Sequence, residues 1–162
     1  MPNTLVGLPP RDHPLAGQKN IPLARIAEEP FILREPGSGT RDATLRVFNA
    51  QKLRPKVRME LGSNEAIKHG MVGGLGISVL SLHTLTLEGT SGPICILDVE
   101  GFPIFRQWFL VYPKGKELSL VSKAFLDFAL SIEPRMHDRM EKIWPDYRKI
   151  LAQSEKQKSA AG

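Results

Sequence analysis

Residues 31–41 read FILREPGSGTR, and this stretch decides the fold class. A short apolar run, Phe31–Leu33, is followed by two glycines among polar residues, and an amphipathic segment comes next. The pattern predicts a strand, a tight glycine turn and a helix in direct succession. Because the first N–H groups of a helix have no partner within it, an anion is their natural ligand. For this segment alone, a well-capped helix without a ligand is an equally good interpretation.

A second stretch repeats the same arrangement. Residues 57–61 are typical of a strand, and Ser63 or Asn64 can cap a helix over 64–73. Glycines then end that helix, and a β-branched run predicts another strand over 77–80. Two helix N-termini from adjacent strand–helix units could therefore face one crevice, at the carboxyl ends of the strands where open α/β sheets bind ligands.

The remaining pattern predicts an α/β fold with mainly parallel pairing around these units. Further strands are expected over 4–8, 31–34, 93–97 and 104–112, and helices over 22–29, 40–53 and 119–131. The buried face of the helix over 40–53 is expected to hold Ala43, Thr44, Val47, Phe48 and Ala50. The buried face of the helix over 119–131 is expected to hold Val121, Ala124, Phe125, Phe128 and Ala129.

The C-terminal segment carries a weaker pattern. Apolar residues recur at helical spacing, and we interpret them as packing residues: Met136, Met140, Ile143 and Trp144. Pro145 is expected to break or kink this segment, and Tyr147, Ile150 and Leu151 suggest another short helix. The polar tail over 153–162 is expected to be disordered.

Length and composition fit a globular domain with a real core. The chain has 162 residues, of which 41% are hydrophobic and 24% charged. The start lacks a basic segment followed by a long apolar one, and no apolar run approaches membrane-spanning length, so a cytoplasmic location is expected. Cys95 is the single cysteine and cannot form an internal disulfide, so we interpret it as a small buried hydrophobe.

The net charge of +5 is concentrated in one segment. Residues 41–58 hold one anion, Asp42, and six cations: Arg41, Arg46, Lys52, Arg54, Lys56 and Arg58. Such a face could attract an anionic metabolite, or DNA in an assembled regulator, but a solvated helix face is the better interpretation for most of these side chains. The exceptions are Arg41 and, just outside the segment, Arg34, because these two flank the glycine loop.

Catalytic chemistry finds little support. The loop over 37–40 lacks the spacing and the Gly-Lys-Ser/Thr ending of a P-loop. The four histidines show no metal-ligand spacing with cysteine or paired carboxylates, and Asp98 and Glu100 have no recognisable nucleophile beside them. We therefore predict no enzyme activity, no catalytic residue, no metal and no cofactor.

Several motifs occur in an order that carries a family resemblance. They are Asp12–Ala16, Pro30–Arg41, Glu60–Lys68, Gly74–Ser81, Leu97–Ile104, Gln107-Trp108 and Ala124–Phe128. Together they closely resemble the effector-binding domain of LysR-type transcriptional regulators, and most of all the regulators of RuBisCO and carbon-fixation operons. The resemblance extends over roughly residues 3 to 131.

This resemblance implies a type II periplasmic-binding-protein-like effector domain. Residues 1–82 would form a nearly complete second subdomain (βαβαβ), 83–131 would return to a partial first subdomain, and 132–162 would be a helical extension and tail. Family members begin with a helix-turn-helix that is not recognisable here, so we expect a truncated form that does not bind DNA directly. Strands of the first subdomain would lack their neighbours, which predicts an unpaired strand edge and exposed apolar surface.

The resemblance also implies a function. We expect an effector sensor that binds a small anionic metabolite between two subdomains: a carboxylate, a phosphorylated compound such as a sugar phosphate or phosphoglycolate, or NADPH. The expected effector-binding residues are Arg34, Ser38, Gly39, Thr40, Arg41, Ser63, Asn64 and Glu65, with Glu65 shaping the pocket or capping its helix. Homo-oligomers, or hetero-oligomers with a full-length regulator, are the expected assemblies. Two alternatives stay open: a vestigial or interaction-only fragment, and a solute-binding protein, against which the lack of a signal peptide argues.

Overall fold

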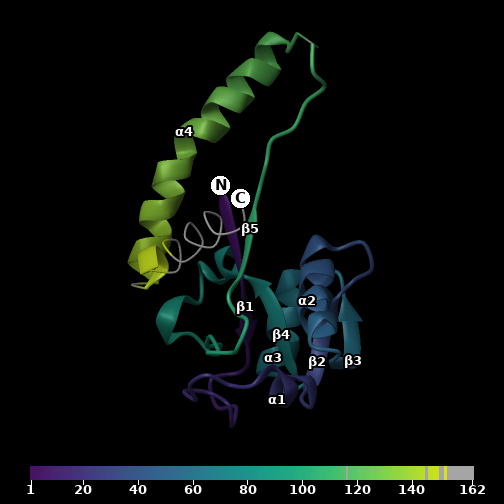
Figure 1. Cartoon of the computed structure of the whole chain (residues 1–162). Coiled ribbons are helices and arrows are strands. Elements are labelled where there is room, and N and C mark those ends of the chain that lie inside the picture. Colours follow the sequence, from purple (N-terminus) through teal and green to yellow (C-terminus); the bar gives the residue numbers. More distant parts are fainter. Residues whose placement is uncertain (116, 145, 150–151, 153–162) are drawn as a thin grey trace. The chain divides into compact units, whose positions relative to one another are not determined.

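A five-stranded mixed sheet organises the chain in a computed structural model that describes residues 1–115, 117–144, 146–149 and 152. The structure divides into two compact units. One is Thr4–Arg106, and the other joins Met1–Asn3 to the residues from Gln107 onward. The first unit holds almost all of the sheet and its covering helices, so it is the part that positions the candidate site (Figure 1).

The sheet has the strand order β3-β2-β4-β1-β5. These strands are β1 (Pro2–Leu8), β2 (Pro30–Arg34), β3 (Lys56–Leu61), β4 (Ile77–Ser81) and β5 (Ile104–Gln107). Strand β2 is parallel to both β3 and β4, whereas β1 is antiparallel to β4. The predicted strand–helix succession and its mainly parallel pairing are therefore confirmed.

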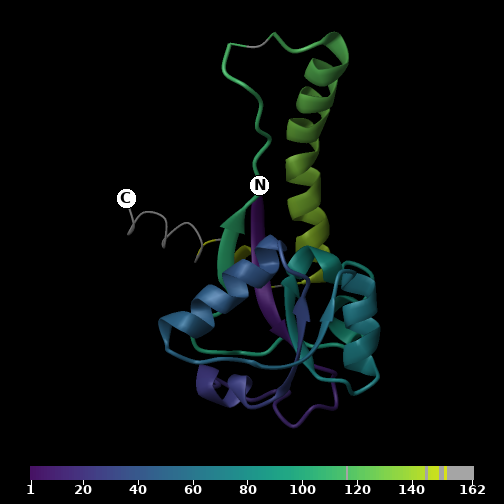
Figure 2. The same ribbon diagram turned by 90° about the vertical axis from the view of Figure 1, so that its right-hand side faces the viewer.

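The helices of this unit are α1 (Leu23–Ala27), α2 (Gly39–Ala50) and α3 (Asn64–Val72), followed by the 3₁₀ turns η1 (Leu82–Leu85) and η2 (Gly89–Ser91). Helices α2 and α3 cover opposite faces of the sheet (Figure 2). This follows from the strand order, because the connection from β2 leads to one neighbour, whereas the connection from β3 crosses back past β2 to β4.

Helix α2 packs on the larger core cluster. Phe48 lies edge-on to Phe31 of β2, with ring centroids 5.9 Å apart and an interplanar angle of 84°. Ala43, Thr44 and Phe48 are buried as predicted, whereas Val47 is half-buried and Ala50 is exposed. The prediction was wrong for Ala50 because it is the last helical residue and lies beyond the edge of the core.

Between β4 and β5 the chain forms no strand over residues 93–97, so that prediction was wrong. This segment makes an isolated bridge between Pro10 and Ile94, and the Leu97 amide donates to the carbonyl of Gly7 at 2.9 Å. Pro93 has no N–H to donate, which explains why a regular ladder does not start there. Cys95 is half-buried rather than fully buried, and its burial raises the pKa of the thiol.

The second unit contains the long helix α4 (Leu120–Ile143), coloured green to yellow in Figure 1. The predicted helix over 119–131 is confirmed, but it continues through Pro134. Its predicted buried face was wrong, because Val121, Phe125 and Phe128 are 79%, 60% and 60% exposed, Ala124 is exposed too, and Ala129 is only half-buried. An amphipathic pattern identifies an apolar face but does not supply a neighbour to cover it.

The predicted strand over 104–112 was also too long, because β5 ends at Gln107 and the apolar residues 108–112 are exposed. Exposed apolar surface, as predicted, is therefore a property of this unit. In the C-terminal segment, Met140 and Tyr147 are buried, and the Tyr147 hydroxyl lies 3.2 Å from His137 Nδ1. Residues 147–149 are helical. The predictions for Pro145, Ile150, Leu151 and the tail over 153–162 concern positions outside the described residues.

Candidate anion-binding site at two helix starts

The carboxyl ends of β2 and β3 form the edge at which the candidate site lies. The two strands are adjacent and parallel, and the loops that follow them lead to helices on opposite faces of the sheet. This divergence is the topological switch point at which open α/β sheets bind ligands. Both helix starts expected from the sequence are therefore present at one edge.

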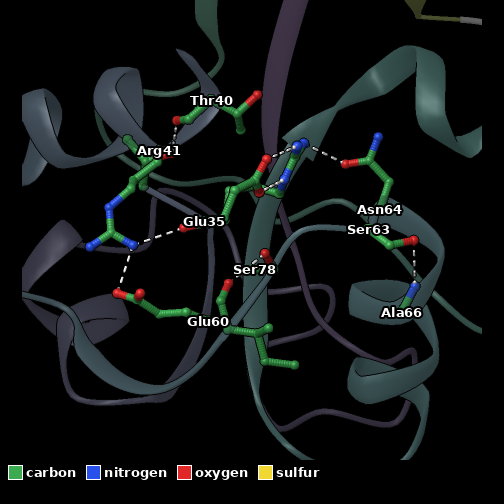
Figure 3. A network of polar contacts seen from close by, with 11 residues as sticks. Glu35, Thr40, Arg41, Glu60, Ser63, Asn64, Ala66 and Ser78 are labelled. Atoms are coloured by element: carbon green, nitrogen blue, oxygen red, sulfur yellow. Dashed lines mark hydrogen bonds and ion pairs between the residues drawn. The ribbon is translucent and has the colours of Figure 1, made fainter. Parts of the chain in front are cut away.

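At the first start, Ser38 is the N-cap residue of α2 in an extended conformation. Gly37 supplies the turn with a φ of +85°, and the Ser38 amide donates to the carbonyl of Glu35 at 3.2 Å. The Ser38 side chain is buried but makes no capping hydrogen bond. The Thr40 carbonyl accepts from the Thr44 hydroxyl at 2.8 Å within the helix (Figure 3). The first N–H groups of α2 thus receive no side-chain cap.

At the second start, Ser63 caps α3 as expected, because its hydroxyl accepts from the Ala66 amide at 3.4 Å. Asn64 Oδ1 accepts a hydrogen bond from Arg34 Nη1 at 2.8 Å, which joins the end of β2 to the start of α3 (Figure 3). Glu65 does not cap the helix and instead pairs with Lys68 at 2.7 Å. The two starts differ: α3 is capped by its own serine, whereas α2 is not.

The two arginines expected to supply charge both have carboxylate partners. Arg34 makes two hydrogen bonds to Glu35, of 2.7 and 2.8 Å, and this pairing lowers the pKa of the Glu35 carboxyl. Arg41 Nη1 lies 2.6 Å from Glu60 Oε1 and also donates to the Arg34 carbonyl at 2.8 Å (Figure 3). Each pair is nearly neutral, so these side chains hold the loops in place more than they present charge.

A third arginine, which sequence reasoning missed, lies at the start of α2. A Cβ built on Gly39 would be 2.7 Å from Nη2 of Arg106, 3.3 Å from Nη1 and 3.4 Å from Cζ. The guanidinium of Arg106 therefore rests on the backbone of the first helical residue. One signal was available: Ile104 packs against the core that α2 covers, and residues two apart on a strand share a face.

The expected site residues thus form two groups. At the start of α2, Gly39 lies against Arg106 and is flanked in sequence by Ser38 and Thr40. At the start of α3, Arg34 binds both Glu35 and Asn64, and Ser63 is the N-cap residue. Arg41 and Glu65 are engaged with their own acidic or basic partners. Within the described ranges, no group of three or more histidine, cysteine or acidic side chains is placed to hold a metal ion. Of the helices that the structure describes, none is long and apolar enough to cross a membrane.

The fold agrees with what comparison with known proteins shows. The family model described as the LysR substrate binding domain matches residues 1–132. The chain therefore belongs to the LysR substrate-binding domain family, and the resemblance stated from the motifs is confirmed.

Two similar proteins are transcriptional regulators by name, and one of them is named for the RuBisCO operon. The chain is 52% identical over 126 residues to the HTH-type transcriptional activator CmpR from a Synechocystis species, which covers 78% of this chain and 41% of CmpR. It is 51% identical over 140 residues to the RuBisCO operon transcriptional regulator of Allochromatium vinosum, covering 86% of this chain and 46% of that regulator. The chain spans less than half the length of these two relatives.

Two solved structures of similar domains contain small molecules. The regulatory domain of CcmR from Synechocystis, in complex with 2-PG, superposes with a TM-score of 0.77 at 48% identity, covering 82% of this chain and 64% of that one. The effector-binding domain of QuiR, in complex with shikimate, gives a TM-score of 0.68 at 25% identity, covering 83% and 63%. The chain therefore has the α/β fold of LysR-type effector-binding domains.

Proposed function

We propose that this chain is the effector-sensing portion of a LysR-type regulator of carbon-fixation genes and binds a small anionic metabolite. The binding element is the start of α2, supported by the start of α3. The function is non-enzymatic, because the relatives are transcriptional regulators and no catalytic constellation is recognisable from the sequence.

The observation that carries this proposal is the open N-terminus of α2. A helix start presents unpaired N–H groups and the positive end of the helix dipole, and both favour a negative ligand. Here the N-cap hydroxyl leaves those groups free, and the first helical residue is an exposed glycine that keeps them accessible. The two similar domains bound to 2-PG and shikimate support a small-molecule role for this part of the chain.

Effector binding would act on the whole regulator by shifting a conformational equilibrium. A ligand that contacts one arrangement of the effector domain more strongly than another favours that arrangement by the difference in binding free energy. In the whole regulator, this shift would be passed on to the DNA-binding step.

A thermal-shift and calorimetric screen of the 162-residue chain tests the proposal. The ligands are phosphoglycolate, a sugar bisphosphate, NADPH and shikimate, with sodium chloride of matched ionic strength as the control. An anion at about 100 times its Kd stabilises the folded state by about 2.7 kcal/mol, so the melting temperature should rise by several degrees. If none of these compounds changes the melting temperature at millimolar concentration, the chain is not an effector sensor.

A second candidate function, a module that acts through protein association, is favoured by the exposed apolar residues of the second unit. They include Trp108, Phe109, Leu110, Val111, Tyr112, Leu120, Val121, Phe125, Phe128 and Leu130. A groove of about 470 Å³ between residues 110–112 and the start of α4 is lined mainly by these side chains. Patches of this kind are typical of association surfaces. Light scattering after size-exclusion chromatography would decide, since a monomer at high concentration contradicts this candidate.

A further inference from the structure

We propose that Trp144 and residues 146–149, here called the C-terminal clasp, form an autoinhibitory contact on α4 that limits the pairing of its apolar stripe with a second copy of the chain. This inference rests on the second candidate function, association through the exposed apolar residues of the second unit. It adds to that function a partner and a means of regulation.

The apolar stripe runs along the whole of α4. Its members recur three or four residues apart, which is the spacing of one helix face. They are Val121, Phe125, Phe128, Ile132, Met136, Met140 and Ile143. In a folded protein, such a face normally packs against another element.

Exposure of the stripe falls toward the C-terminal end of α4. Val121 and Phe125 are 79% and 60% exposed. Further along, Ile132 and Met136 are half-buried, and Met140 is 1% exposed. The covered end of the stripe, coloured yellow in Figure 1, is the end at which the chain folds back.

Tyr147 is the main contact between the C-terminal clasp and α4. This side chain is 1% exposed, its ring centroid lies 5.8 Å from that of His137, and its hydroxyl lies 3.2 Å from His137 Nδ1. His137 and Met140 are three residues apart on the helix, so they lie on the same side of it. The clasp therefore folds back onto the part of α4 where the stripe is buried.

Two features indicate that this contact is weak enough to open. Arg148 Nε donates to Glu141 at 2.6 Å, but the two side chains are 68% and 39% exposed, so the pair contributes little and is screened by salt. Trp144 Nε1 is buried without a hydrogen-bond partner among the residues that the structure describes. A buried N–H of this kind opposes closure, because it has lost its bond to water. The closed clasp thus depends mainly on the burial of Tyr147.

The area of the uncovered surface suits a second copy of the chain. The exposed aromatic side chains of the second unit are 46% to 74% exposed, and they are Trp108, Phe109, Tyr112, Phe125 and Phe128. At roughly 200 Å² each, they present about 600 Å² of apolar surface. Two such faces in a symmetric dimer would bury about 1,200 Å², which is enough for a specific interface.

The charges of α4 do not oppose this pairing. Residues 119–131 hold only two charged side chains, Lys123 and Asp127, which are opposite in sign. Each is two residues from Phe125, and two residues correspond to about 200° around a helix, so both lie on the side away from the stripe. Opening of the clasp would extend the uncovered stripe toward Ile143, and a longer apolar seam pairs more strongly.

Dye binding, trypsin cleavage and light scattering on the full 162-residue chain test the inference. Tyr147→Ala removes the ring that is buried in the closed clasp. It should raise the fluorescence of a hydrophobic dye about 2-fold and speed cleavage after Arg148 about 10-fold, because cleavage requires local opening. The Kd for self-association should fall about 10-fold.

Two further variants separate the clasp from general effects. Lys149→Ala is the matched control, because this side chain is 81% exposed and bonds to Asp146 within the clasp itself. It should leave dye binding and the Kd unchanged. Adding Phe125→Lys to Tyr147→Ala should abolish the gain in self-association, because it places a charge on the stripe, whereas association caused by unfolding would persist.

Two results would overturn the inference: unchanged dye binding, cleavage and Kd in Tyr147→Ala, or equally strong association after Phe125→Lys is added. In both, self-association of the wild-type chain leaves the second candidate function standing. If neither the wild type nor Tyr147→Ala self-associates at high concentration, a second copy is not the partner, and the inference and that candidate function fail together.

Discussion

Replacing Gly39 by alanine separates ligand binding from stability at the start of α2. The new Cβ would lie 2.7 Å from Nη2 of Arg106, closer than real Cβ contacts allow, so the guanidinium must move. Arg106 has no bonding partner among the described residues, and the end of a long side chain shifts at little cost. The backbone at Gly39 is not in the left-handed region, so alanine fits the helix itself.

Gly39→Ala should preserve the free energy of unfolding but weaken ligand binding. Alanine is favoured over glycine within a helix by up to about 1 kcal/mol, and by less in the first turn. The free energy of unfolding should therefore stay within about 0.5 kcal/mol of the wild-type value or rise. Phosphoglycolate affinity should fall about 10-fold, because the Arg106 cation is displaced from the helix start.

Urea denaturation without ligand and calorimetry with phosphoglycolate measure the two effects. Gly62→Ala is the matched control at the end of β3, where a Cβ would make an ordinary 3.9 Å contact with Glu35. It should change neither property appreciably. Unchanged affinity in Gly39→Ala, or destabilisation by more than about 1 kcal/mol, would refute the reasoning.

The remaining predictions concern stability and surface. Lys68 is 3% exposed, and its Nζ lies 2.6 Å from Glu88 Oε1. Lys68→Met should lower the free energy of unfolding by about 3 kcal/mol, because the Glu88 carboxylate loses its cation. A urea midpoint like that of the wild type would contradict this. Burial by itself would lower the pKa of Lys68, but the hydrogen bonds to its two carboxylate partners, Glu65 and Glu88, outweigh burial and raise this pKa. The stability of the wild type should therefore fall as the pH rises above about 10.4, and it should fall more steeply than that of the methionine variant. Phe48→Ala should lower the free energy of unfolding, measured by urea denaturation, by about 3 to 5 kcal/mol, because the ring is fully buried. Asn49→Ala, at the exposed neighbouring position, should lower it by less than about 0.5 kcal/mol. Phe125→Lys should reduce binding of a hydrophobic dye without lowering the melting temperature, and a lower melting temperature would show that this residue packs in solution.

The sequence predicted the first unit well, for a clear physical reason. Apolar runs bounded by glycines and capping residues specify strands and helices locally, and Phe31 and Phe48 fall on faces that must meet in the core. The errors lie where local pattern and tertiary context differ. Val121 and Phe125 have helical spacing, but only a neighbouring element decides whether such a face is buried. Residues 93–97 are apolar enough for a strand, yet they form only an isolated bridge and separate backbone hydrogen bonds with residues 7–11 instead of a continuous ladder.

The site was only partly predictable because charge pairing depends on strand register. Arg34 and Arg41 flank the glycine loop, which made them natural candidates, and their proximity to the helix starts is real. Glu35 is adjacent in sequence and could have been suspected as a partner of Arg34. Glu60, in contrast, meets Arg41 only because β3 pairs with β2 in one register, Leu33 opposite Glu60. Arg106 was missed because it is distant in sequence and reaches Gly39 through the packing of β5.

These pairings divide the arginines of the site by role. Arg41 binds both the end of β2, through the Arg34 carbonyl, and the end of β3, through Glu60. Arg34 in turn joins β2 to the start of α3. Such bonds fix the two helix starts before any ligand arrives, which limits the ordering cost of binding. Arg106 has no bond of this kind, so its charge is available to a ligand. Loss of a positioning arginine should therefore weaken both fold and binding, whereas loss of Arg106 should weaken binding alone.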